Sequence, residues 1–305
     1  MKDLQEFLPE DLPDDPMLTY RHASNLGKAN VLPREMAATQ QSLEEWSENM
    51  FVDHGYSVEE ARLVTGLPQE QLAGIRDSLL AAKAPEPKAQ GLIKILPYPG
   101  GRHPRIGFLD GAFDPMRGTK FSVFLPWDPL QYVVVDLPEA IFSNLGLTYL
   151  AHRHFPTIWD YQYTFIDNID WQVYKDGSLE NTWLLPNGIA FGATARPGKD
   201  NVEMELWLTN GTDQLLDSLR TQVCVMLKGA DGYTDLTNEN KKFSSNTAEV
   251  KSANSDQWIA TSWEHTFNVW GNADVPCLHT DPQFPDCAPG DTVRLKGRLW
   301  FYEEK

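Results

Sequence analysis

Short segments of alternating apolar and polar residues, separated by turn formers, fill the chain from about residue 92 to residue 302. Successive side chains of a β-strand point to opposite faces, so this two-residue period predicts strands with one buried face. Dipeptides that favour tight turns punctuate them: Asp176-Gly177, Asn187-Gly188, Asn210-Gly211 and Pro289-Gly290. The expected strands are 92–96, 120–125, 132–136, 147–154, 171–175, 181–185, 189–195, 202–210, 220–227, 258–263 and 293–302. About eleven strands at such short spacing predict a mainly β fold, a large antiparallel β-sandwich of supersandwich or jelly-roll type.

The first 90 residues have a different, helical pattern. Prolines among acidic residues predict an extended arm, which is followed by a helix over 34–50. Ser57 and Glu60 form a capping box, Gly66 ends that helix, and Pro68 begins another that runs to about Lys83. A linker is predicted over 84–91. We therefore expect a cap or docking element in 1–90 and a β-sandwich domain in 91–305.

The charge balance restricts the partners. With 26 basic and 43 acidic residues, the net charge is −17, which disfavours nucleic acid and anionic membranes. The helix pair at 57–80 resembles a helix-turn-helix in outline, but its second helix offers only Arg76 and Lys83 against Glu70 and Asp77. A protein partner or self-association through 1–90 is the preferred interpretation, and a small molecule or glycan is the expected substrate.

The sequence contains no apolar run long enough for a membrane helix. Its N-terminus lacks the basic start and apolar core of a secretory signal. These patterns predict a cytoplasmic protein, or a secreted one if a signal peptide has been removed.

Two histidines end the strand expected over 147–154. His152 and His154 are two residues apart, so both imidazoles point to one face of the strand. Three interpretations stay open: ligands of a divalent metal, acid/base or substrate-binding residues, and structural histidines. Glu264 and His265 are the preferred partners of this pair, and His279 or His103 the next.

Tryptophan and charge share one face of several strands. In 202–210, Glu203, Glu205 and Trp207 alternate with apolar residues, and 293–302 shows the same pattern. One interpretation is a solvated surface with cross-strand ion pairs. The other is a ligand-binding face, because a tryptophan ring packs on a sugar while charged groups bind its hydroxyls. Trp159, near the histidine strand, is a candidate substrate-binding residue for the same reason.

Two loops rich in glycine, arginine and aspartate, 100–105 and 110–120, are candidate binding loops. Arg102, His103, Arg117 and Lys120 are the residues we expect to hold a substrate carboxylate or sulfate. Ordinary turns with surface ion pairs are the alternative.

Two further segments carry specific expectations. The stretch 137–146 has Pro138 and Gly146 at positions typical of a helix start and stop, which predicts a short helix. The stretch 274–287 is predicted as a long loop, in which Cys277 and His279 are candidate zinc ligands and Cys277 and Cys287 can form a disulfide. The sequence has no motif for binding a nucleotide cofactor.

The β region resembles the galactose-mutarotase-like supersandwiches of sugar epimerases and some polysaccharide lyases and glycosidases. The segment 202–212, a sandwich strand with its turn, and the paired histidines beside carboxylates carry this resemblance. It implies a carbohydrate-active enzyme, a lyase, isomerase or hydrolase, although the family's catalytic histidine and glutamate have no position-by-position match here. His152 and His154 would bind a divalent metal or act as acid and base, assisted by Glu264 or His265. The alternative is a non-catalytic glycan- or protein-binding module.

Overall fold

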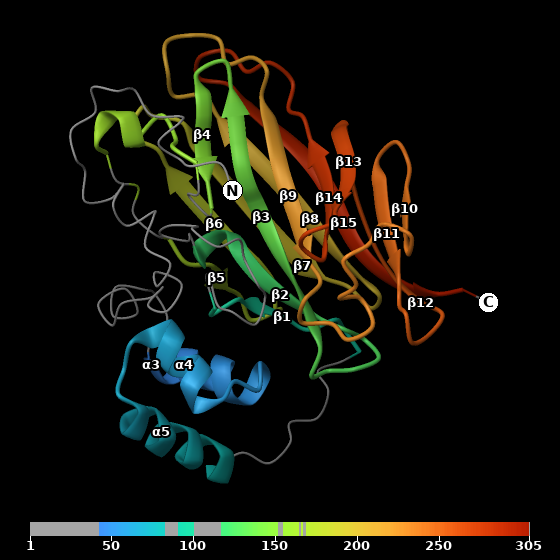
Figure 1. The fold of residues 1–305 in the computed structure, drawn as a ribbon. Coiled ribbons are helices and arrows are strands. Elements are labelled where there is room, and N and C mark those ends of the chain that lie inside the picture. Colours follow the sequence, from blue (N-terminus) through green and yellow to red (C-terminus); the bar gives the residue numbers. More distant parts are fainter. Residues whose placement is uncertain are drawn as a thin grey trace.

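Two antiparallel sheets stacked face to face form a sandwich with helices at one end (Figure 1). The computed structural model describes residues 43–82, 91–100, 117–151, 155–164, 166 and 169–304. The described helices are α3 (Leu43–Glu48), the π-helix η3 (Asn49–Asp53), α4 (Val58–Thr65), α5 (Gln69–Ala82) and the short 3-10 helices η4 (Arg117–Thr119) and η5 (Asp160–Gln162). This architecture confirms the predicted mainly β sandwich with a small helical region.

The first sheet has seven strands, six of them in the order β1-β2-β3-β9-β14-β13, with β4 paired to β3. Its strands are β1 (Ile95–Pro97), β2 (Lys120–Phe124), β3 (Tyr132–Ser143), β4 (Gly146–Leu150), β9 (Arg220–Met226), β13 (Thr266–Asn272) and β14 (Cys277–Pro282). Strands distant in the sequence thus become neighbours, and β3, β9 and β14 lie side by side.

The second sheet has eight strands in the order β10-β11-β12-β15-β8-β7-β6-β5. Its strands are β5 (Gln172–Val173), β6 (Leu179–Leu184), β7 (Ala190–Pro197), β8 (Asn201–Thr209), β10 (Lys241–Phe243), β11 (Thr247–Lys251), β12 (Gln257–Trp263) and β15 (Thr292–Glu303). Strand β8 follows the predicted alternation: Met204, Leu206 and Leu208 are buried against the first sheet, while Glu203 and Trp207 face outward.

A second core covers the outer face of the first sheet. Apolar residues of the helices, such as Trp46 and Leu72, pack with Phe124, Tyr132 and Met226 of that sheet. Both faces of β3 are buried, so its sequence is a nearly continuous apolar run and does not alternate between apolar and polar residues. The helices therefore act as a cap on the sheet.

The boundaries of α4 follow the predicted signals. The Ser57 hydroxyl accepts a hydrogen bond from the Glu60 amide, and the Glu60 carboxylate accepts one from the Ser57 amide. Gly66 ends the helix in the left-handed conformation, with φ 68°. The described part of the predicted 34–50 helix begins at Leu43 and continues as a π-helix to Asp53. Residues 83–90 of the linker region lie outside the described residues, so the division into two domains stays a prediction.

The helix predicted over 137–146 is wrong, because β3 runs through most of it. Pairing of 140–143 with β4 and of 140–142 with β9 keeps this part of the chain extended. Pro138 falls in the register shift between Asp136 and Ala140, where no ladder hydrogen bond requires its missing N–H. Similarly, the predicted loop 274–287 contains β14, and β10, β11 and β13 were not expected.

None of the helices in the described part of the chain is long and apolar enough to span a membrane.

The two faces of β8 should respond differently to truncation. We expect Leu206→Ala to lower the free energy of unfolding by about 2–5 kcal/mol, because it leaves a cavity between the sheets. Glu203 lies on the opposite, exposed face of the same strand. Glu203→Ala should therefore change the free energy of unfolding by less than about 0.5 kcal/mol. Urea denaturation measures both, and equal losses would contradict the assigned faces.

Candidate functional site

Most residues of the predicted histidine and loop sites lie outside the described residues. This applies to His152, His154, Arg102 and His103. Arg117 begins η4, but its side chain is not among those described. Their roles therefore stay predictions.

Two of the expected substrate-binding residues are buried. Lys120 is 0% exposed, and its Nζ lies 3.3 Å from Oδ1 of Asp136. The Trp159 indole N–H donates to the Thr148 carbonyl at 2.7 Å. These positions give both side chains structural partners inside the fold and favour a structural role over substrate contact.

The expected histidine partners are not brought together. Glu264 and His265 form an exposed turn between β12 and β13, where Glu264 Oε2 accepts a hydrogen bond from the Lys296 amide. His279 is instead buried on β14. The described residues therefore contain no site that combines these three side chains.

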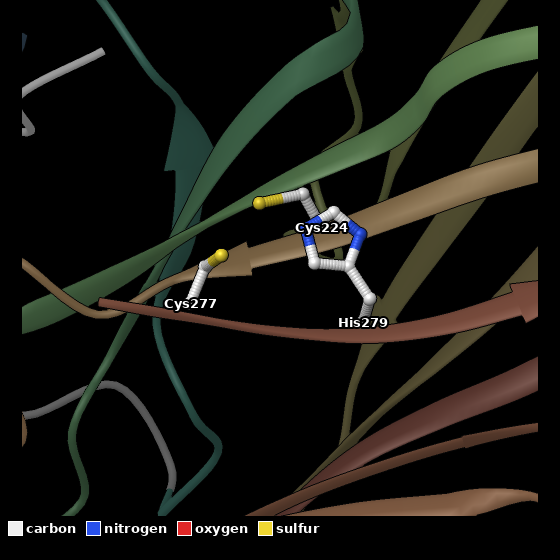
Figure 2. Close-up of side chains that lie close together, drawn as sticks. All are labelled: Cys224, Cys277 and His279. Carbon is white, nitrogen blue, oxygen red and sulfur yellow. The ribbon is translucent and has the colours of Figure 1, made fainter. Parts of the chain in front are cut away.

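A different cluster forms around His279. Cys277 and His279 are two residues apart on β14, so both point to the outer face of the first sheet. On the neighbouring strand β9, Cys224 lies directly opposite His279. One ligand atom from each of the three residues lies within 4.8 Å of the others. Figure 2 shows the two sulfur atoms and one ring nitrogen of His279 turned toward a common space.

The imidazole of His279 is held on its other side. Its Nδ1 lies 3.5 Å from Asp281 Oδ1 and 3.8 Å from Glu139 Oε2. The Trp270 ring stacks on it, with centroids 3.9 Å apart and an interplanar angle of 13°. Trp270 also donates its indole N–H to Asp281 Oδ2 at 2.7 Å, and the Val223 amide donates to Oδ1 at 3.2 Å. The ring plane and the carboxylate are thus both fixed.

The cluster is part of a polar row across the first sheet. Direct cross-strand pairing aligns Lys120, Asp136, Cys224, His279 and Trp270 on β2, β3, β9, β14 and β13. The first four of these residues are at most 3% exposed. Buried polar groups require charged or hydrogen-bonding partners, which this row provides from strand to strand.

The thiols and the imidazole influence each other strongly. A hydrogen bond from Cys224 lowers the pKa of the Cys277 thiol to about 5, against the effect of burial and with help from His279. Burial by itself would lower the pKa of His279, but hydrogen bonds with Asp281 and Cys277 and the charge of Glu139 raise it to about 10. The same hydrogen bond to Cys277 and burial raise the pKa of the Cys224 thiol well above its usual value.

The sequence interpretation missed Cys224 entirely. The strand predicted over 220–227 is correct in position. Its alternation already places Cys224 on the other face of the strand from Val223 and Val225. The pairing of β9 with β14 could not be read from the sequence, because β14 was taken as a loop. The disulfide that the sequence left open between Cys277 and Cys287 is not formed, since both cysteines are free.

A second candidate site lies on the outer face of the second sheet. A groove of about 720 Å³ is lined by residues of β6, β7 and the turn before β6: Tyr174, Lys175, Asp176, Ser178, Leu179, Glu180, Thr194 and Arg196. This volume is within the range of small-ligand sites. Tyr174 is 46% exposed and its hydroxyl donates to Glu180 Oε2 at 3.0 Å.

Trp207 continues this surface on the adjacent strand β8. It is half-buried and faces outward, directly opposite Gly192 of β7. A methyl group at Gly192 would come within 2.6 Å of the indole, so the absence of a side chain there lets the ring lie over β7. Thr194, which lines the groove, is the next outward residue of the same strand.

Comparisons with known proteins give only distant likenesses. No protein-family model matches the sequence, and no curated protein matches it significantly. One similar structure is described as "Putative kojibiose phosphorylase from human microbiome", with TM-score 0.31, 11% identity, and coverage of 42% of this chain and 18% of that chain. The match therefore spans less than a fifth of that protein's length.

Two other solved structures show similar values. A protein of Synechocystis sp. PCC 6803 has TM-score 0.35 and 12% identity, over 61% of this chain and 88% of its own. A polysaccharide lyase has TM-score 0.31 and 10% identity, over 44% of this chain and 23% of its own. Two of the three are thus carbohydrate-active by name and none is named a mutarotase, but at these TM-scores the likeness decides neither fold nor function.

The state of the cysteines is directly testable. All three are free and at most 3% exposed. In the absence of reductant, we expect the folded protein to react slowly with a thiol reagent, and the protein unfolded in guanidinium to expose all three thiols. A count of one thiol in the unfolded protein would instead indicate a disulfide.

Proposed function

We propose that the protein is carbohydrate-active and binds a neutral saccharide in the groove on the outer face of the second sheet. The observation that carries this proposal is the combination of an exposed tyrosine ring with charged and hydroxyl groups in one groove. An aromatic ring offers a flat apolar surface to the C–H face of a sugar, while carboxylates and a guanidinium bind its hydroxyls. Trp207 provides a second ring beside the groove.

The charges of the groove favour a neutral ligand. Lys175 and Arg196 are matched by Asp176 and Glu180. A uronic acid or sulfated sugar would also be repelled by the overall charge of −17. A neutral oligosaccharide is therefore the substrate class that fits.

The reaction, an isomerase or hydrolase step on that saccharide, is the finer part of the proposal. A lyase step, the third reaction expected from the sequence, needs a uronic acid and does not fit a neutral saccharide. His152 and His154 are its candidate acid and base. Glu264 and His265, the assisting residues expected from the sequence, do not line the groove. A non-catalytic glycan-binding module is the alternative, and it uses the same groove. Protein docking through residues 1–90 stays a separate proposal.

Binding can be tested with a glycan array followed by calorimetry on the best neutral oligosaccharide. Tyr174→Ala should weaken binding about fivefold, because stacking of a sugar on one ring contributes about 1 kcal/mol. Arg196→Ala should weaken it to a similar extent. Tyr161→Ala is the matched control, since Tyr161 is 42% exposed and does not line the groove. Equal affinities for all variants, or no binding of any neutral glycan, would remove this proposal.

Catalysis needs a second measurement. If the protein turns over the bound saccharide, His152→Ala should abolish turnover and leave calorimetric binding at the groove unchanged. Full activity of His152→Ala and His154→Ala would exclude both histidines as acid or base. Binding without turnover by the unaltered protein would favour the non-catalytic module.

A further inference from the structure

We propose that Cys224, Cys277 and His279 bind one zinc ion between β9 and β14. This site lies on the opposite sheet from the saccharide groove and does not depend on it. The metal would be coordinated by the two sulfur atoms and by the His279 ring nitrogen that faces them (Figure 2).

The spacing of the ligand atoms suits a tetrahedral ion. Zinc binds sulfur at about 2.3 Å and imidazole nitrogen at about 2.0 Å, which places two ligand sulfurs about 3.8 Å apart. The three ligand atoms already lie within 4.8 Å of one another. The two sulfurs therefore need to approach each other by at most about 1 Å to bind one zinc ion.

The surroundings of His279 match those of a metal-binding histidine. Such histidines usually donate the other ring N–H to a carboxylate, which fixes the tautomer and the ring orientation. Here Nδ1 lies 3.5 Å from Asp281 Oδ1, on the side where such a carboxylate stands, while the opposite ring nitrogen faces the sulfurs. Asp281 is itself held by the Trp270 indole and the Val223 amide. Asp281 is therefore a positioning residue.

A disulfide explains the two cysteines less well. Because Cys224 is opposite His279 and Cys277 is opposite Met226, the two cysteines are diagonal neighbours. Diagonal positions on paired strands are about 7–8 Å apart at Cα, beyond the usual range for a disulfide. An ion between the sulfurs spans this distance without distorting the ladder.

A cysteine nucleophile also fits poorly. Reactive cysteines are partially exposed, whereas Cys224, Cys277 and His279 are 3%, 2% and 3% exposed. The cysteines belong to the apolar core that the helical cap covers. A buried zinc ion is compatible with this enclosure, because the two cysteines bind it as thiolates and His279 as a neutral imidazole, and the protons that they lose pass to solvent.

The choice of zinc follows from the donor set. Two thiolates and an imidazole select a soft or borderline ion with tetrahedral preference, and calcium or magnesium would require oxygen donors. Three protein ligands leave a fourth position, which water or one more side chain fills. Because both ligand strands share a core with the cap, zinc binding should also stabilise the cap on the sheet.

The test is metal binding by the full chain, reduced and incubated with zinc alone, then desalted and measured by mass spectrometry of the metal. We expect about one equivalent per chain for the unaltered protein and less than about a tenth for Cys277→Ser or Cys224→Ser. Cys287→Ser is the matched control, because Cys287 is a third buried free cysteine outside the cluster, and it should retain about one equivalent.

Two measurements remain decisive if a variant does not fold. Zinc X-ray absorption of the unaltered protein should show two sulfur ligands at about 2.3 Å. Asp281→Asn should weaken zinc binding about 10–100-fold while the absorption spectrum of its cobalt form keeps the same ligands, as expected for a positioning residue.

Less than about a tenth of an equivalent in the unaltered protein, an all-oxygen coordination shell, or equal metal loss in Cys287→Ser and Cys277→Ser would each overturn the proposal. The zinc experiment does not involve the groove on the second sheet. Its result therefore neither supports nor contradicts saccharide binding, which is tested separately.

Discussion

The burial of the first sheet on both faces is the constraint on which the rest of the structure depends. Its inner face packs on the second sheet, and its outer face lies partly under the helical cap. Any polar side chain on that outer face loses water and needs a partner. The row from Lys120 to Trp270 meets this need with an ion pair, a thiol pair and a histidine that stacks on Trp270, with its Nδ1 3.5 Å from the Asp281 carboxylate. The polar cluster is thus a consequence of the layered architecture.

The two sheets consequently differ in what they can do. The second sheet exposes its outer face, where charged residues, Tyr174 and Trp207 are accessible to a ligand from solvent. The first sheet encloses its polar residues, and the thiols there are protected from solvent. Recognition of a soluble molecule therefore suits the second sheet, and a permanently bound ion suits the first.

Local patterns predicted much of the fold correctly. The capping box at Ser57, the end of α4 at Gly66 and the alternation of β8 all depend on neighbours a few residues away. The failures lie where partners from distant segments determine the conformation. Pro138 suggested a helix start, but β3 pairs with neighbouring strands on both sides of it, at 132–136 and at 140–143, so the chain stays extended. The proline-rich stretch around Cys277 suggested a loop, but β9 and β13 pair on either side of it.

The sequence by itself determined that the chain forms a sandwich, because a two-residue period with frequent turns leaves few other ways to bury one face of each strand. It also identified the principle of the site, that two ligands at i and i+2 on a strand converge. Only the tertiary structure showed that Cys277 and His279 on β14 form such a pair next to Cys224. Cys277 and His279 are two residues apart, but Cys224 is more than fifty positions away and reaches them through the register of β9 and β14. That register is set by packing of the whole sheet, which no local pattern specifies.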